Sequence, residues 1–191
     1  MTEGPLALVE RVAAMLDDLG IPYALGGSLA SSFIGEPRST VDVDIAIDLD
    51  PAAAERLLDC VAAQFYVPVT AARAAIAAHS SFNAVDVEHG LKVDVFVLGG
   101  GTLDRRQIER RVFVTVPGID RPIAVTSPED QVLRKLDWYR SGGGVSEHQW
   151  RDVIGILRVH GEAMDFADLE TAAKPLGLSA LLARVRAAVP D

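Results

Sequence analysis

The chain has 191 residues, of which 49% are hydrophobic, and it is long enough to form one domain around a substantial core. Its formal net charge of -9 excludes a protein that coats nucleic acid through bulk electrostatics, and its single cysteine, Cys60, excludes a disulfide framework and a cysteine-based zinc site. The segment from Met1 to Pro5 has no basic residue and no apolar run approaches the ~18 residues of a membrane span, so we expect a soluble, cytoplasmic protein without a membrane partner.

The N-terminal part of the chain predicts a helix, a short strand and a glycine turn that opens a second helix. Apolar residues recur at helical spacing from Leu6 to Leu19, and Gly20 stands where a helix C-cap belongs. The run Ile21 to Leu25, the turn Gly26-Gly27-Ser28 and the stretch Leu29 to Phe33 are typical of a strand, a tight turn and a helix.

Two later strands carry acidic residues on one face. From Val41 to Asp48 apolar and polar residues alternate, so Asp42 and Asp44 leave the same face of a strand, with alpha carbons roughly 6 to 7 Å apart. Asp94 alternates with valines and also projects from one face of a strand. Carboxylates this close repel one another unless a divalent cation compensates, and magnesium prefers such oxygen ligands. If the two strands are neighbours, the three aspartates form a metal site.

The other elements are expected in the following order. The patterns predict helices from Asp50-Pro51 through Val61 and over Thr70 to Ala78, a hairpin between Phe82 and Leu98 that turns at Glu88-His89-Gly90, strands at Val112 to Val116 and Ile123 to Val125, helices starting at Ser127-Pro128 and Ser146, and helices at Phe166 to Ala173 and Leu178 to Val189. This order predicts an α+β fold in which a mixed twisted sheet is flanked by helices and followed by a C-terminal helical bundle.

The turn Gly26-Gly27-Ser28 is the candidate phosphate-binding element. Glycines let the backbone approach a phosphate closely, the following helix presents its amides and positive dipole, and the Ser28 hydroxyl adds a donor. By itself such a turn is more often only a turn, and an Asp-x-Asp strand is more often a solvated face. A phosphate loop, an acidic strand and a third carboxylate in this order favour two-metal phosphoryl transfer, with ions about 4 Å apart.

These motifs resemble a known family. Gly26-Gly27-Ser28-Leu29-Ala30, Gly35-Glu36-Pro37-Arg38-Ser39-Thr40 and Asp42-Val43-Asp44 are similar to the signature of minimal nucleotidyltransferases of the DNA polymerase beta-like superfamily, and Asp94 matches its third carboxylate. The resemblance is closest to the branch of the AbiEii-type toxins and extends from about Tyr23 to about Leu157. It implies the polymerase-beta-like nucleotidyltransferase fold, with residues 1–126 as the catalytic core and residues 127–191 as a helical region that closes the nucleotide cleft.

The resemblance also implies further site residues. In that branch a lysine on a helix after the sheet and an aspartate on the next helix complete the active site, and Lys135 and Asp152 match them. Lys135 is expected to contact the triphosphate, as is Arg38. The alternative is an ordinary solvated lysine at Lys135 and an ordinary partner of Arg151 at Asp152.

The implied activity is transfer of a nucleoside monophosphate from a nucleoside triphosphate to a hydroxyl group, with Mg²⁺ or Mn²⁺ as cofactor and pyrophosphate as leaving group. Three acceptors stay open: the 3' end of a transfer RNA, a protein side chain, or a small molecule such as an aminoglycoside. An antitoxin protein is a further candidate partner. The alternatives are a nucleotide-binding or antitoxin-binding protein that has kept the fold without the chemistry, and a structural domain with a solvated acidic strand.

Basic and aromatic residues form two weaker candidate surfaces. The basic residues either face an anionic acceptor or form a solvated helix face that balances Glu109 and nearby acids; they are Arg105, Arg106, Arg110 and Arg111, with Arg134, Lys135 and Arg140. Trp138, Tyr139 and Trp150 either frame a base-stacking surface or pack between two late helices. The four histidines show no ligand spacing and are assigned no role.

Overall fold

A computed structural model describes residues 4–36, 40 and 42–189 of the chain. Its helices are α1 (Pro5–Asp18), α2 (Gly27–Ile34), the 3-10 helix η1 (Pro51–Ala53), α3 (Ala54–Gln64), α4 (Val69–Ala77), α5 (Thr102–Glu109), α6 (Pro128–Ser141), α7 (Glu147–His160), α8 (Phe166–Ala173) and α9 (Ser179–Ala187). Its strands are β1 (Tyr23–Leu25), β2 (Asp42–Ile47), β3 (Ser81–Asp86), β4 (Leu91–Val97), β5 (Val112–Val114) and β6 (Ile123–Val125). Each element predicted from the sequence has a counterpart, and α5 is an addition.

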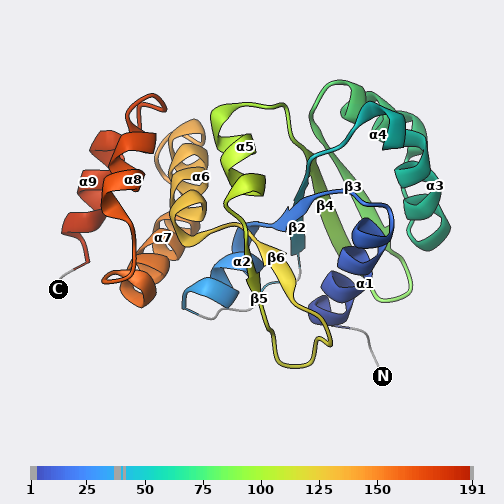
Figure 1. Cartoon of the computed structure of the whole chain (residues 1–191), viewed down its shortest axis with the longest axis horizontal. Coiled ribbons are helices and arrows are strands. Elements are labelled where there is room, and N and C mark those ends of the chain that lie inside the picture. Colours follow the sequence, from blue (N-terminus) through green and yellow to red (C-terminus); the bar gives the residue numbers. More distant parts are fainter. Residues whose placement is uncertain (1–3, 37–39, 41, 190–191) are drawn as a thin grey trace.

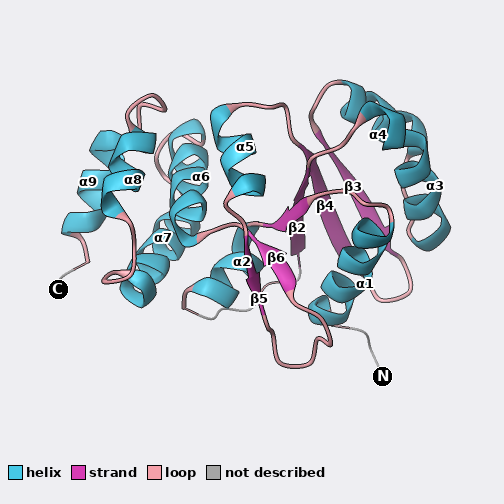
Figure 2. Ribbon diagram, in the orientation of Figure 1, coloured by secondary structure: helices cyan, strands magenta, loops and turns pink. Residues whose placement is uncertain are grey.

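The strands form one mixed sheet in the order β3-β4-β2-β1-β6-β5 (Figure 2). Strand β2 runs parallel to β4 and β1 runs parallel to β6, whereas the pairs β1–β2, β3–β4 and β5–β6 are antiparallel. The hairpin predicted between Phe82 and Leu98 is therefore confirmed as β3–β4. The parallel pair β2–β4 positions the acidic residues, because it joins strands that α3, α4 and β3 separate along the chain.

The two faces of the central strands differ in burial. Along β4, Leu91, Val93, Val95 and Val97 are buried, whereas Lys92, Asp94 and Phe96 are partly exposed. The buried face joins a hydrophobic cluster with residues of α1 and α3, so the opposite face is left for polar side chains.

Most of the helices gather toward the two ends of the molecule. Figure 1 shows α1, α3 and α4 toward one end and the C-terminal helices α6 to α9 at the other, with α2 and α5 between them. The predicted α+β class, with a mixed sheet and a C-terminal helical bundle, is confirmed. Over the ranges given above, no helix is long and apolar enough to cross a membrane.

Several helix ends follow the predicted capping pattern. The side chains of Ser127 and Ser146 each accept a hydrogen bond from the backbone N–H three residues on, and Gly20 has the left-handed φ of 66° after α1. Asp50 also acts as an N-cap by accepting from the N–H of Ala52. The turn that follows is the 3-10 helix η1, which precedes α3, so the predicted α-helix starts three residues late.

An ion-pair network connects α5 with the C-terminal helices α6 and α8. Arg106 of α5 lies 2.6 Å from Asp130 of α6 and 2.5 Å from Asp168 of α8, and Arg110 lies 3.4 and 3.1 Å from the same two aspartates. The side chain of Arg106 is only 16% exposed. Arg106 therefore balances nearby acids, as one interpretation of the basic cluster predicted, but its guanidinium joins three helices and is not solvated.

Candidate active site

The acidic strands are neighbours, which meets the condition set for a shared metal site. Strand β2 lies parallel to β4 with Asp44 opposite Asp94 and Asp42 opposite Lys92. Since side chains two apart share a face of a strand, all four side chains leave the same face of the sheet. The pairing places a carboxylate of β4 directly beside the carboxylate of Asp44.

Lys92 lies between two of the carboxylates, a position the sequence analysis did not assign. Its Nζ is 2.8 Å from Asp94 Oδ2 and 3.7 Å from Asp42 Oδ1. The hydrogen bond to Asp94 raises the pKa of Lys92, so the ammonium stays charged. The alternation along β4 already put Lys92 on the face of Asp94, but only the pairing with β2 shows that it also contacts Asp42.

The glycine turn is held against the acidic strand. The backbone N–H of Gly26 donates to the carbonyl oxygen of Asp44 at 2.9 Å, and the carbonyl of Gly27 accepts from Gln131 Nε2 at 2.6 Å. Gly27 has a φ of 61°, and a Cβ at this position would lie 1.8 Å from Asp44 Oδ2. The carboxylate of Asp44 therefore occupies the space that only a glycine leaves open, at the first residue of α2.

The surroundings of Asp44 raise its pKa. Burial raises its pKa, the neighbouring charge of Asp94 raises it further, and the charge of Lys135 opposes both effects. A carboxylate with this raised pKa lacks enough positive charge around it, which is the setting in which a divalent cation is favourable.

The donor chemistry of the site fits Mg²⁺ or Mn²⁺, because three carboxylates leave one face of two adjacent strands. In this structure Asp42 and Asp94 have the ammonium group of Lys92 between them. Among the residues that the structure describes, no group of three His, Cys, Asp or Glu side chains is arranged to hold a metal ion. The metal role of Asp42, Asp44 and Asp94 therefore stays a prediction.

Lys135 and Asp152 form a buried ion pair between α6 and α7. Lys135 is 0% exposed, and its Nζ lies 2.6 Å from Asp152 Oδ2 and 3.2 Å from Gln149 Oε1. The alternative of a solvated lysine is wrong, as is the pairing of Asp152 with Arg151. Contact between Lys135 and a triphosphate stays a prediction, although its charge acts on Asp44.

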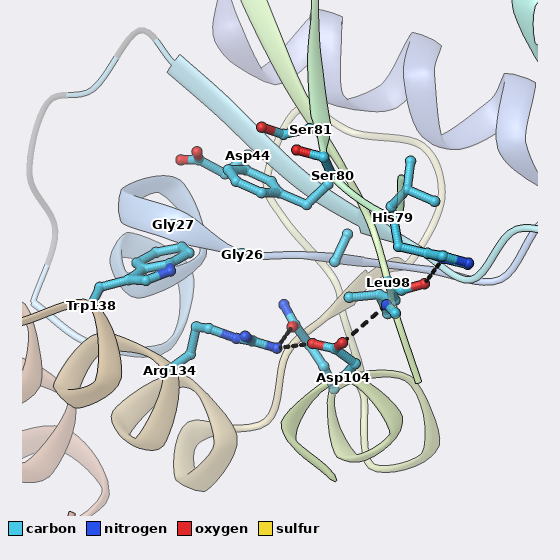
Figure 3. A pocket seen from close by; sticks show the side chains of 15 residues that line it. Gly26, Gly27, Asp44, His79, Ser80, Ser81, Leu98, Asp104, Arg134 and Trp138 are labelled. Carbon is cyan, nitrogen blue, oxygen red and sulfur yellow. Dashed lines mark hydrogen bonds and ion pairs between the residues drawn. The ribbon is translucent and has the colours of Figure 1, made fainter. Parts of the chain in front are cut away.

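A cavity of about 270 Å³ opens beside Asp44 (Figure 3). Its wall comes from the glycine turn, the ends of β2 and β4, the start of β3, and helices α5 and α6. It is lined by Gly26, Gly27, Asp44, Ala46, His79, Ser80, Ser81, Phe96, Val97, Leu98, Gly99, Asp104, Gln107, Arg134 and Trp138.

An ion pair borders this cavity, and the sequence did not predict it. Arg134 donates to Asp104 Oδ1 at 2.7 Å and to Gln107 Oε1 at 3.0 Å, as Figure 3 shows. Burial raises the pKa of Asp104, but the hydrogen bonds from Arg134 and from the backbone of Gly99 hold it below its usual value. No sequence signal joined these residues, because α5 was not assigned and Asp104 lies 30 positions before Arg134.

The aromatic residues divide between packing and the cavity. Tyr139 and Trp150 contact each other with ring centroids 5.3 Å apart, which confirms packing between α6 and α7. Trp138 instead lies 6.1 Å from the ring of Phe96 and lines the cavity. His79, assigned no role, lines it as well, with a φ of 47° and its Nδ1 2.8 Å from the carbonyl oxygen of Leu98.

Ser28 and Arg38 are the two other predicted phosphate contacts, and the structure describes only Ser28. Ser28 is in the first turn of α2, directly after Gly27, as predicted for a hydroxyl donor at a helix start. Arg38 lies outside the described residues. The phosphate role of Gly26, Gly27, Ser28 and Arg38 stays a prediction.

Comparison with known proteins finds similarity at the level of structure. No model of a protein family matches the sequence, and a search of curated protein sequences gives no significant match. A nucleotidyltransferase-like antigenic protein from Paracoccidioides brasiliensis is 20% identical, with a TM-score of 0.53 over 78% of this chain and 73% of its own. The antibiotic-resistance factor ANT(2'')-Ia is 13% identical, with a TM-score of 0.61 over 94% of this chain and 95% of its own.

The chain has a nucleotidyltransferase fold. These similarities agree with the mixed sheet and the helices described above, and they cover most of the chain. The closer resemblance to the AbiEii-type branch stays a prediction.

Proposed function

We propose that this protein is a metal-dependent nucleotidyltransferase that transfers a nucleoside monophosphate from a nucleoside triphosphate to a hydroxyl group. The pairing of Asp44 with Asp94 in the β2–β4 register, directly beside the glycine turn, carries the proposal. It puts a candidate phosphate-binding helix start and two carboxylates next to each other on the nucleotidyltransferase fold.

Each group has a definite part in the proposed reaction. Gly27 and Ser28 bind the phosphates through backbone amides and the Ser28 hydroxyl, and Gly26 leaves room for their approach, while Asp42 and Asp44 hold the cation. The bound Mg²⁺ or Mn²⁺ neutralises the triphosphate and the leaving pyrophosphate. Asp94 completes the cation site or accepts the proton of the acceptor hydroxyl as that oxygen attacks the α-phosphate. The α-phosphate then exchanges its bond to pyrophosphate for a bond to the acceptor oxygen.

Lys135 has an electrostatic part in the same proposal. It is fully buried, and its charge lowers the pKa of Asp44, which favours the ionised form that binds a cation. Asp152 keeps Lys135 in place through the 2.6 Å ion pair. The helical region from residue 127 onward thereby closes one side of the nucleotide cleft.

Two observations favour a small molecule as acceptor. The chain carries a net charge of -9, and Arg106 and Arg110 of its densest basic cluster are ion-paired with aspartates, which weakens the case for RNA. The similar structure that spans 94% of the chain is an antibiotic-resistance factor.

A labelling screen tests the proposed function. The purified chain is incubated with each α-labelled nucleoside triphosphate, Mg²⁺ or Mn²⁺, and in turn an aminoglycoside panel, total transfer RNA and a protein extract. The proposal expects label on a small molecule and release of pyrophosphate, both lost in Asp44→Asn. Label on transfer RNA instead establishes the acceptor that the toxin resemblance implies. Nucleotide binding without transfer to any acceptor favours the alternative of a non-catalytic nucleotide-binding protein.

A further inference from the structure

The ammonium group of Lys92 lies close to two carboxylates. Its ammonium lies 2.8 Å from Asp94 and 3.7 Å from Asp42, so it bridges the strands β4 and β2. These two aspartates are candidate cation ligands, and Lys92 is the positive group between them. The geometry therefore makes Lys92 and a divalent cation alternatives for the same negative charge.

The residues that lie opposite Lys92 and Asp94 on β3 carry no charge. On its other side β4 pairs with β3, where Val85 stands opposite Lys92 and Asn83 stands opposite Asp94. Neither residue is ionisable, so β3 provides no competing carboxylate at these two positions. The side chain of Lys92 is 38% exposed, which leaves it room to turn toward solvent when its partners bind another cation.

We propose that Lys92 is a built-in competitor of the metal ion: it neutralises Asp42 and Asp94 in the metal-free protein and must be displaced for a divalent cation to bind. This inference rests on the proposed function, because it takes these aspartates as cation ligands. It adds that the metal affinity is set by the exchange of one positive group for another. The metal-free protein thus avoids uncompensated repulsion between its aspartates, at the cost of weaker metal binding.

The test measures Mn²⁺ binding to the full chain without nucleotide or acceptor, by the electron paramagnetic resonance signal of unbound Mn²⁺. Lys92→Gln removes the competing charge and keeps a side chain of similar length. We expect its dissociation constant for Mn²⁺ to be about tenfold lower than that of the wild-type protein. Lys92→Arg keeps the charge and should stay within about threefold of wild type.

A matched control separates the local effect from net charge. Lys174→Gln changes the net charge by the same amount at an exposed position after α8, outside the candidate site, and should leave the dissociation constant within about twofold. Asp94→Asn should weaken binding strongly if the measured ion is at the proposed site.

Thermal unfolding provides a second readout. Without metal, Lys92→Gln leaves Asp42 and Asp94 without their shared partner and should melt below wild type, whereas at saturating Mn²⁺ the two proteins should melt at nearly the same temperature. A merely structural ion pair predicts the same deficit with and without metal.

The outcomes separate the two proposals. Equal Mn²⁺ affinity in Lys92→Gln and Lys174→Gln, or weaker binding in Lys92→Gln, overturns the competition while leaving the metal site intact. No saturable Mn²⁺ binding in wild type or in any variant overturns both the competition and the metal role in the proposed function. Tighter binding confined to Lys92→Gln, with convergence of melting temperatures at saturating metal, supports the competition.

Discussion

The substitution Gly27→Ala tests whether the position of Asp44 against the glycine turn matters for activity. A Cβ on Gly27 would lie 1.8 Å from Asp44 Oδ2, and the Cγ and Cβ atoms of the same side chain would lie at 2.4 and 2.7 Å. Since non-bonded carbon and oxygen atoms rarely approach within about 3 Å, the carboxylate must move by about 1 Å or more. The residue that moves is the central aspartate of the proposed metal site.

Two costs follow from this displacement. The φ of 61° at Gly27 costs an alanine about 1 to 2 kcal/mol, which for a chain of this length lowers the melting temperature by about 2 to 8 °C. A misplacement of about 1 Å at a catalytic group is expected to lower turnover by on the order of a hundredfold. The variant should therefore fold with moderate loss of stability and lose most of its activity.

The neighbouring glycine is the matched control. A Cβ on Gly26 would meet Gln107 Nε2 at 3.5 Å and the backbone oxygen of Asp44 at 3.9 Å, which are ordinary contacts, and the φ of -122° suits any residue. Gly26→Ala should unfold at a temperature similar to that of wild type and keep its Mn²⁺ affinity within about threefold, because the carboxylate of Asp44 stays in place.

The assay follows pyrophosphate release with the acceptor identified in the labelling screen, and Mn²⁺ binding reports on Asp44 independently of any acceptor. Equal turnover and equal Mn²⁺ affinity in Gly27→Ala and Gly26→Ala would show that the position of Asp44 against the turn affects neither catalysis nor metal binding.

Two other substitutions test the electrostatics of the site. Because burial and Asp94 raise the pKa of Asp44 above its unfolded value, ionised Asp44 costs stability at neutral pH. Asp44→Asn should thus melt above wild type in a chelator, with a difference that vanishes as the pH falls below the ordinary carboxyl range; a lower melting temperature at neutral pH contradicts the assignment. Lys135→Met removes one charge of the buried pair with Asp152 and should lower the free energy of unfolding by about 3 to 5 kcal/mol in urea titrations. The double variant with Asp152→Asn should recover part of this loss, and a change of only ~0.5 kcal/mol would restore the solvated interpretation of Lys135.

The structure also shows which variant is the better control for Lys135→Met. Arg134 is the adjacent basic residue on α6 and is the natural comparison from the sequence alone. It lines the cavity and pairs with Asp104, so its loss is expected to disturb the site as well. The double variant with Asp152→Asn is the better control, because it removes both charges of one buried pair.

Local patterns in the sequence determined most of the secondary structure. The alternation around Asp42 and Asp44, the glycine turn before α2 and the capping serines of α6 and α7 depend on residues within a few positions of one another. Alternation also showed that Asp94 lies on the polar face of its strand. These signals are local because backbone hydrogen bonding in helices and side-chain alternation in strands have short periods.

Only the tertiary structure decided which polar faces meet. The pairing of β2 with β4 placed Asp44 beside Asp94 and brought Lys92 to Asp42, and the packing of α6 on α7 buried Lys135 against Asp152. A periodic pattern states which face of an element a residue occupies, but not which element lies opposite or in which register. That choice follows from burial of the whole core, in which residues far apart along the chain contribute together.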